Sequence, residues 1–218
     1  MARKLVLPEF GRFAAPDRRD RKFLLAPRRA TRRRRIWRTT WVGDQLQTPQ
    51  CVGYAWAGLL RCAPINQFLL PAGIYQMAQQ CDEWEGDAYE GTSVRGGAKV
   101  LHALGVIAEY RWAFDAATVA RHVLTVGPVV FGTNWYEGMM TPNARGRVTL
   151  DGGPLGGHAY LINGANLDTG ELDGVNSWGR EWGVRGRFKL SFDQVDQLLD
   201  EDGEACTAVE TKPVAGAA

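Results

Sequence analysis

The sequence of 218 residues lacks long apolar segments. No run approaches the roughly 20 apolar residues that a membrane-spanning helix needs, and the N-terminus has no apolar core of the kind that signal peptides carry. We therefore expect a cytoplasmic protein without a transmembrane segment. With 45% hydrophobic and 10% aromatic residues, the chain can bury the core of one globular unit. No internal repeat appears.

Cysteine is also scarce, since the chain has only Cys51, Cys62, Cys81 and Cys206. Four scattered cysteines are too few for a small disulfide scaffold, and none forms the Cys-x-x-Cys pair that is typical of zinc sites. We expect no metal and no other cofactor. One disulfide among the three cysteines other than Cys51 stays open, although a reducing compartment disfavours it.

Acidic residues are rare at the N-terminus. Residues 1–40 hold 14 Lys or Arg and 3 Asp or Glu, a net charge of +11, whereas the rest of the chain holds 12 and 21, a net charge of −9. The density is highest at Arg28, Arg29 and the run 32–35, so we treat residues 1–35 as a basic, Arg-rich arm. Such an arm can bind an anionic partner, either nucleic acid or a membrane surface. It can equally be a solvated, partly disordered segment or lie across the acidic remainder of its own chain.

The remaining residues, 36–218, change character near residue 112. Helical patterns come first, and we predict helices over about 49–62, with Thr48 as N-cap, over about 74–83, and over about 94–104, with Thr92 or Ser93 as its cap. A fourth helix is capped by Asp115 and ends before Gly127. Strand patterns dominate afterwards, at 129–133, 148–150, 158–163, 172–176, 187–190 and 205–210. This order predicts a helical lobe of about 44–112 and a β lobe of about 113–218.

Cys51 lies in the first turn of the first predicted helix. There the positive end of the helix dipole stabilises a thiolate and lowers the pKa of a thiol. The spacing of Val52, Ala55, Trp56 and Leu59 marks a buried face, which indicates a central helix. A cysteine in this position is, taken alone, more often an inert core thiol, so its chemistry depends on what lies elsewhere in the chain.

A thiol nucleophile needs a base, a group that holds the base and donors for the oxyanion. His158 begins one predicted strand and Asn176 ends the next, and an antiparallel pair can place them side by side. The asparagine carbonyl can then accept one ring N–H, which leaves the other nitrogen for the thiol. Trp178 can cover this bond, and Gln45 can supply an oxyanion donor. The set predicts acyl transfer, most simply hydrolysis.

Four separated motifs resemble those of the papain-like cysteine peptidases. They are Gln45 with Cys51, Gly157-His158-Ala159, Asn176-Ser177-Trp178-Gly179, and Gly127-Pro128-Val129-Val130. The resemblance implies an α+β, papain-like two-lobe fold. In that fold a long central helix carrying the nucleophile packs against an antiparallel sheet or barrel lobe, and the active site lies in the cleft between.

The resemblance also implies roles for individual residues. Cys51 would be the nucleophile, His158 the general base and then acid, Asn176 its orienter, and Gln45 an oxyanion donor beside the Cys51 N–H. A peptide or protein substrate would form a thioester acyl-enzyme that water hydrolyses. Five residues would bind substrate: Gly91 and Thr92 along its backbone, Gly132 and Ala159 in a roomy, neutral specificity pocket, and Trp178.

Some features depart from the family pattern. Val52 stands where a tryptophan usually follows the nucleophile, Thr48 replaces a common cysteine, and the spacing from Cys51 to His158 is short. The chain therefore resembles compact bacterial-type members. Its arm lacks the length of an inhibitory prosegment, so we do not expect control by a folded prosegment. Two other functions stay open: another cysteine-dependent amide or isopeptide hydrolase or acyl transferase, and a catalytically silent binding module with an anion-binding arm.

Overall fold

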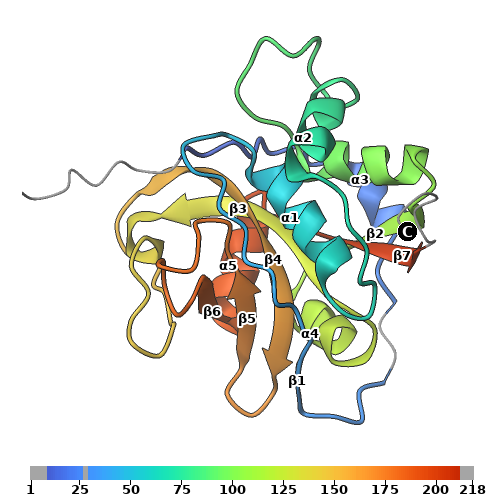
Figure 1. The fold of residues 1–218 in the computed structure, drawn as a ribbon. Helices are drawn as coiled ribbons and strands as arrows, with labels where there is room; N and C mark the ends of the chain where they lie inside the picture. The colour runs from blue at the N-terminus through green and yellow to red at the C-terminus, as the bar shows by residue number, and fades with distance from the viewer. Residues whose placement is uncertain (1–8, 27–28, 212–218) are drawn as a thin grey trace, which may run out of the picture.

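A computed structural model describes residues 9–26 and 29–211. Three helices, α1 (Cys51–Arg61), α2 (Pro71–Gln79) and α3 (Val94–Ala103), lie together on one side of a twisted antiparallel sheet (Figure 1). Two further helices, α4 (Ala116–Thr125) and α5 (Phe192–Asp200), contact each other and the sheet. None of the helices in the described ranges is long and apolar enough to cross a bilayer.

The sheet runs in the order β2-β7-β3-β4-β5-β6, and β1 pairs with β4 off this path. Its strands are β1 (Arg34–Ile36), β2 (Ile107–Ala113), β3 (Val129–Tyr136), β4 (Pro154–Asn166), β5 (Glu171–Val175), β6 (Arg187–Ser191) and β7 (Glu204–Thr211). Because β4 is long and central, it pairs with β3, β5 and β1 and also contacts α1. Residues on β4 are therefore held from several sides.

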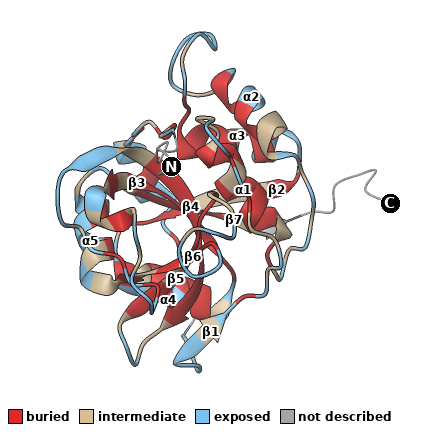
Figure 2. Ribbon diagram, turned by 60° about the vertical axis from the view of Figure 1, so that its left-hand side comes forward, coloured by how far each residue is buried: buried red, intermediate tan, exposed pale blue. Residues whose placement is uncertain are grey.

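Helix α1 is the central helix that the sequence pattern predicts. Cys51, Val52, Trp56 and Leu59 are buried completely, and Figure 2 shows α1 and β4 among the buried elements at the centre of the molecule. The indole N–H of Trp56 donates to the carbonyl of Val94 at 3.0 Å. A Cβ at Gly97 would lie 2.3 Å from the Trp56 ring, so only glycine lets α3 approach α1 this closely.

The helix starts follow the sequence in two cases and not in a third. Ser93 and Asp115 cap α3 and α4 by accepting from the backbone N–H groups of Gly96 and Thr118, as such residues commonly do. The predicted Thr48 cap is wrong, because α1 has Gln50 at its N-cap without a side-chain bond. Thr48 instead donates its hydroxyl to the Gln45 carbonyl.

Other predictions of individual elements need correction. Strand β2 and helix α5 were not expected, and residues 148–150 form no strand. Helix α5 has a sequence signal, the capping box of Ser191 and Gln194. Strand β2 falls in the range assigned to the helical lobe but pairs with β7 in the sheet. The division into lobes near residue 112 stays a prediction.

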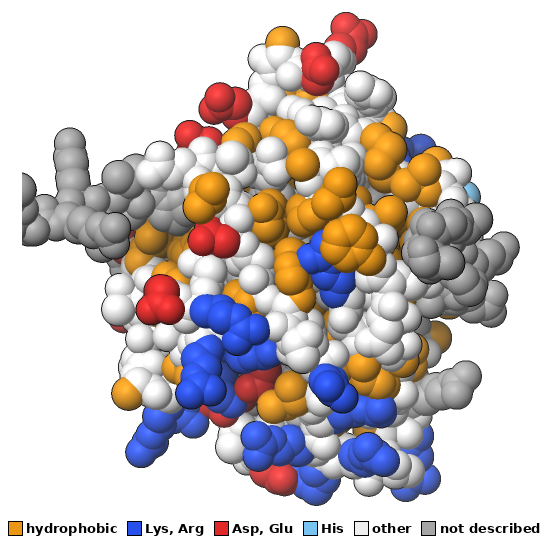
Figure 3. Space-filling model, viewed as in Figure 1, with side chains coloured by type: hydrophobic (Ala, Val, Ile, Leu, Met, Phe, Trp, Pro, Cys, Tyr) orange, Lys and Arg blue, Asp and Glu red, His pale blue; other side chains and the backbone are white. Residues whose placement is uncertain are grey.

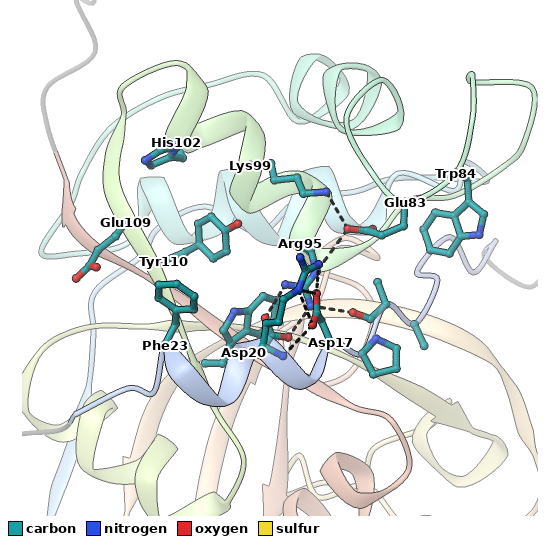
Figure 4. Close-up of a pocket in the computed structure, with 15 residues that line it drawn as sticks. Asp17, Asp20, Phe23, Glu83, Trp84, Arg95, Lys99, His102, Glu109 and Tyr110 are labelled. Atoms are coloured by element: carbon teal, nitrogen blue, oxygen red, sulfur yellow. Dashed lines mark hydrogen bonds and ion pairs between the residues drawn. The ribbon is translucent and has the colours of Figure 1, made fainter.

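The described part of the N-terminal arm lies across the rest of the chain. Arg35 pairs with Ala165 of β4, and a short 3-10 helix, η1 (Arg18–Lys22), reaches α3. There Arg95 donates to both carboxylate oxygens of Asp20 at 2.6 and 2.5 Å (Figure 4). Both side chains are nearly buried, beside an open cavity of about 720 Å³ that Trp84, Lys99 and Tyr110 help to line. Arg28 lies outside the described residues.

Candidate active site

Cys51 stands at the N-terminal end of α1, where that helix meets β4. The thiol is completely buried, and the backbone N–H groups of Val52, Ala159 and Gly11 lie close enough to lower its pKa. Burial raises the pKa of Cys51 above its ordinary value, while these three donors act in the opposite direction. The expectation of a pKa lowered by the helix dipole is therefore not met, because in this state the loss of water outweighs the donors.

His158 and Asn176 are paired as the sequence pattern predicts. The ring Nε2 of His158 lies 2.8 Å from Asn176 Oδ1, and both side chains are buried at the β4–β5 hairpin. His158 Nδ1 is buried and has no hydrogen-bond partner within the described part of the chain. His158 directly precedes Ala159, whose N–H reaches the Cys51 thiol. The arrangement leaves a ring nitrogen without a partner near the nucleophile.

Aromatic rings surround this histidine. The ring centroids of Trp178 and Trp135 lie 4.8 and 4.9 Å from that of His158. Trp178 therefore lies against the histidine whose bond to Asn176 we predicted it to cover. Burial among these rings lowers the pKa of His158 from 6.5 to about 4, because the imidazolium would lose its hydration, although the bond to Asn176 acts in the opposite direction. In this state both the thiol and the imidazole are neutral.

Gln45 is buried, and its carboxamide is held at both ends. Ser177 Oγ donates to Gln45 Oε1 at 2.6 Å, and Gln45 Nε2 donates to the carbonyls of Thr48 at 2.7 Å and Glu9 at 3.1 Å. Ser177 thus fixes which end of the carboxamide donates. We did not single out Ser177 from the sequence, although it directly follows Asn176 in the Asn-Ser-Trp-Gly block.

Residues 9–13, which we call the N-terminal plug, lie over these groups. Thr92 donates its N–H to the Gly11 carbonyl at 2.9 Å and accepts from the Phe13 N–H at 3.0 Å. On the opposite side, the Arg12 N–H donates to the Gly157 carbonyl at 2.9 Å. The backbone at Thr92, predicted to hold a substrate, is thus occupied by the chain itself.

The plug also contacts the predicted catalytic residues. The Phe10 ring meets the rings of His158 and Trp178 edge-on, with centroids 6.1 Å apart in both cases. Two further contacts, described above, join the Glu9 carbonyl to Gln45 and the Gly11 N–H to Cys51. Although the arm is shorter than an inhibitory prosegment, its residues 9–13 cover the site as a short segment with one isolated bridge between Arg12 and Thr92.

The fit of the plug depends on Gly11. A Cβ at this position would lie 1.9 Å from the carbonyl oxygen of Pro49 and 2.5 Å from its carbonyl carbon. Backbone atoms next to α1 cannot move aside as a flexible side chain would. Any larger residue at position 11 would therefore push the plug away from Cys51.

The Arg12 side chain lies over the place where β3 and β7 pair, beside Gly132 and Glu204. A Cβ at Gly132 would lie within about 3 Å of the Arg12 side chain, at 3.0 Å from Nε. The guanidinium donates through Nε and Nη2 to Glu204 Oε2 at 3.2 and 3.0 Å, and through Nη2 to the Asp202 carbonyl at 2.5 Å. Arg12 and Glu204 are both buried. The expected neutral pocket beside Gly132 is therefore acidic at its base.

The residues predicted to bind substrate lie at different places around the site. Gly91 and Thr92 lie beside the plug, Gly132 lies beside Arg12, and Ala159 contacts the nucleophile rather than the Arg12 guanidinium.

All four cysteines are free thiols. Within the described ranges, no group of three or more His, Cys, Asp or Glu side chains is placed to hold a metal ion.

No protein-family model matches the chain. An uncharacterized peptidase C1-like protein of Acanthamoeba polyphaga mimivirus is 26% identical over 160 residues, which cover 53% of this chain and 51% of that protein. The chain thus spans about half the length of the curated relative that it matches.

Solved structures match over most of the chain. Xylellain, a cysteine protease from Xylella fastidiosa, superposes with a TM-score of 0.75 at 21% identity, covering 94% of this chain and 100% of xylellain. The chain has the fold of the papain-like cysteine proteases. Bromelain from Ananas comosus gives 0.62 at 14% identity, covering 82% and 99% of the two chains, and procathepsin B from Trypanosoma congolense gives 0.62 at 13%, covering 93% and 87%.

Two buried histidines predict that the folded state becomes less stable in acid. Burial lowers the pKa values of His158 and His122 from 6.5 to about 4. Between these values the unfolded chain binds protons that the folded chain does not, so stability is full above pH 6.5 and falls as the pH drops towards 4. We expect each histidine to lower the unfolding free energy by about 2 kcal/mol at about pH 5.

Urea unfolding of the parent, His158→Gln and His122→Gln at neutral and acidic pH measures this loss. Each variant should lose about half of the pH dependence that the two histidines cause together. A His158→Gln variant with the full parental pH dependence would contradict the assignment of a buried, neutral His158.

Proposed function

We propose that the protein is a cysteine peptidase that hydrolyses peptide bonds through a thioester acyl-enzyme. One observation carries this proposal: Gln45 Nε2 already donates to a peptide carbonyl, that of Glu9, at 3.1 Å. Ser177 holds the carboxamide in that direction. A preorganised donor beside the nucleophile is what acyl transfer requires, because negative charge develops on the carbonyl oxygen in the transition state.

The chemistry follows from groups already in place, once the plug has left. His158 Nδ1 takes the proton of Cys51, and the thiolate attacks the carbonyl carbon of the scissile bond. Gln45 Nε2 and the Cys51 N–H receive the oxyanion, and the imidazolium returns its proton to the leaving amine as the C–N bond breaks. Water then attacks the thioester, giving up a proton to His158, and the carboxylic acid and the free thiol are released. Asn176 holds the ring throughout.

We further propose that the plug keeps this site inactive. Beside the Cys51 thiol the plug places the Gly11 N–H, which is not an electrophile, whereas its Glu9 carbonyl is held on Gln45. The plug can therefore lie on the nucleophile without being cut by it. It also excludes water, and so keeps the thiol and the imidazole neutral. Activity then requires the plug to move.

Cleavage of an unbiased peptide library tests the activity. We expect the parent to cleave slowly and Cys51→Ala to cleave nothing, because no nucleophile remains. Gln45→Ala should lower kcat by about 10²–10³ through loss of one oxyanion donor. If Cys51→Ala retained the parental cleavage, the assignment of the nucleophile would be wrong. If no peptide were cleaved even with the plug displaced, the chain would be a silent module or act on another acyl group.

Gly11→Ala tests the plug. The new methyl group overlaps the Pro49 backbone, so we expect peptide cleavage to rise about tenfold, the effect of roughly 1.4 kcal/mol of strain in the closed state. Iodoacetamide should also alkylate Cys51 faster than in the parent, with buried Cys62 and Cys206 as internal references. Gly153→Ala is the matched control, since a Cβ there meets nothing within 4 Å. Equal rates in all three proteins would refute autoinhibition by the plug.

A separate proposal concerns the exposed arginines in and next to β1, which are Arg32, Arg34 and Arg38. We propose that they bind nucleic acid through phosphate contacts. Figure 3 shows Lys and Arg side chains gathered in the lower part of the face that it presents. Arg32, Arg34 and Arg38 are exposed, and Arg180 joins them by donating to the Thr40 carbonyl at 2.6 Å.

Binding of a labelled single-stranded oligonucleotide over a range of salt concentrations tests this proposal. Arg32→Ala with Arg34→Ala should weaken binding and reduce the salt slope by about 1.4, since each lost contact removes about 0.7. Arg19→Ala, which changes an exposed arginine paired with Asp17, should leave the slope unchanged. Binding to anionic vesicles but not to the oligonucleotide would overturn the proposal in favour of a membrane surface.

A further inference from the structure

Trp135 of β3 is completely buried and lies beside His158. In the β3–β4 register Trp135 is opposite Gly156, and Thr133 is opposite His158. The side chains of Trp135 and His158 therefore share one face of the sheet as diagonal neighbours. The centroid of the Trp135 ring lies 4.9 Å from that of His158 and 5.1 Å from that of Trp178. Trp135 thus contacts both the predicted general base and the tryptophan that lies against it.

We propose, on the basis of the proposed peptidase function, that Trp135 is a positioning residue that holds the His158 ring in the orientation that directs Nδ1 towards Cys51. Trp135 acts on the reaction only through His158, since a completely buried side chain cannot touch a substrate. Its replacement should therefore slow the chemical step and leave substrate binding unchanged.

Hydrogen bonding alone does not fix the His158 ring. In the described part of the chain, Nε2 is paired with Asn176 Oδ1, and Nδ1 has no hydrogen-bond partner. One such bond leaves the ring free to turn about the axis that joins Nε2 to Oδ1. The plane of Trp178 is inclined by 35° to the imidazole, and that of Trp135 by 78°. Two packed rings at such different angles restrict both the tilt and the rotation of the imidazole.

The contact with Trp135 remains when the site opens. The Phe10 ring also meets His158 edge-on, at a centroid distance of 6.1 Å, but Phe10 belongs to the plug and would leave with it. Trp135 belongs to β3, which pairs with β4 on one side and with β7 on the other. Because the sheet holds this strand from both sides, Trp135 still packs against His158 in the state that turns over substrate.

The Trp135 indole also carries an unpaired donor. Its N–H is buried and has no hydrogen-bond partner among the residues that the structure describes. The buried indoles of Trp56 and Trp37, by contrast, donate to backbone carbonyls at 3.0 and 2.6 Å. A buried polar group without a partner is unfavourable for folding, and phenylalanine would fill a core position without one. Stability alone therefore does not explain a tryptophan here, whereas a large ring that reaches both His158 and Trp178 does.

Steady-state kinetics in the full chain carrying Gly11→Ala test the proposal, with a peptide that this protein cleaves. We expect Trp135→Leu to lower kcat by about tenfold or more, because a small misplacement of a catalytic group can cost about 10²-fold. KM should change by less than about twofold. Trp135→Phe keeps one aromatic ring, so its kcat should lie between the other two. If Trp135→Leu does not fold, a lower kcat with unchanged KM in Trp135→Phe decides the matter.

The control is Phe188→Leu in the same background. Phe188 is buried in the same cluster, and its ring contacts within the described ranges are with Trp135, Tyr160 and Trp182 rather than His158. This variant also removes core volume, so it should unfold at a lower urea concentration while its kcat stays within about twofold of the background. An equal loss of kcat in Phe188→Leu would show that general packing sets the rate, and would overturn the inference.

Nitrogen-15 NMR of the histidine rings gives a readout that does not depend on cleavage. The chain has three histidines, so His102 and His122 serve as internal references. In the Gly11→Ala protein we expect one fixed tautomer of His158, with the proton on Nε2, because Asn176 Oδ1 accepts there. In Trp135→Leu the two ring-nitrogen signals should broaden or approach each other as the ring turns. Phe188→Leu should keep the signals of the background.

Failure of the proposed function and failure of this inference give different results. If the Gly11→Ala protein cleaves no peptide, the proposed peptidase function fails, and the ring-nitrogen signals alone decide whether Trp135 positions His158. If peptides are cleaved but the Trp135 variants keep the kcat of the background, or change only KM, the function stands and the inference is overturned. Unchanged His158 signals in Trp135→Leu would overturn it in either case.

Discussion

The rest of the structure depends on the packing of α1 against β4. Helix α1 buries Cys51, Val52, Trp56 and Leu59, and β4 buries His158 and Ala159. Where the two elements touch, the Ala159 N–H reaches the Cys51 thiol. This contact places a cysteine next to a histidine that lies far away in sequence. Any loss of the close fit at Gly97, which lets α3 hold α1 in place, would misplace the nucleophile relative to His158.

The N-terminal plug changes the electrostatics of that contact. An exposed Cys-His pair at a helix N-terminus could carry a thiolate and an imidazolium, because water and the helix dipole stabilise both charges. Under the plug both groups are buried, which raises the pKa of the thiol and lowers that of the imidazole. The closed state therefore holds the neutral pair. The same burial that covers the site therefore keeps both the thiol and the imidazole uncharged.

Two buried ion pairs join the arm to the rest of the protein. Arg12 pairs with Glu204, and in the opposite sense Asp20 of the arm pairs with Arg95 of the body. Both pairs lie between the arm and the rest of the protein and are nearly inaccessible to solvent. A buried pair is strongly destabilised when one partner is lost. These pairs fix where the arm lies, whereas its exposed arginines, such as Arg32 and Arg34, are left for other contacts.

Much of this could be predicted from local sequence. The helix at Cys51, the caps Ser93 and Asp115, and the pairing of His158 with Asn176 all follow from periodicity, capping and hairpin geometry, and the structure confirms them. The catalytic roles of these residues and the cytoplasmic location stay predictions. The role of Ser177 could also have been predicted, because this residue belongs to the Asn-Ser-Trp-Gly block. Strand β2 could not have been predicted from its own residues, since its place is decided by pairing with β7 at the far end of the chain.

The sequence by itself determined which groups could do chemistry, because residue type and local periodicity decide the functional group and the face on which it lies. Only the tertiary structure decided that Glu9 to Phe13 cover those groups and that Glu204 meets Arg12. These contacts join residues 9–13 to residues that lie between 36 and 192 positions away in the sequence. No local pattern encodes such a contact, because its free energy comes from burial and charge pairing that exist only after the sheet has formed.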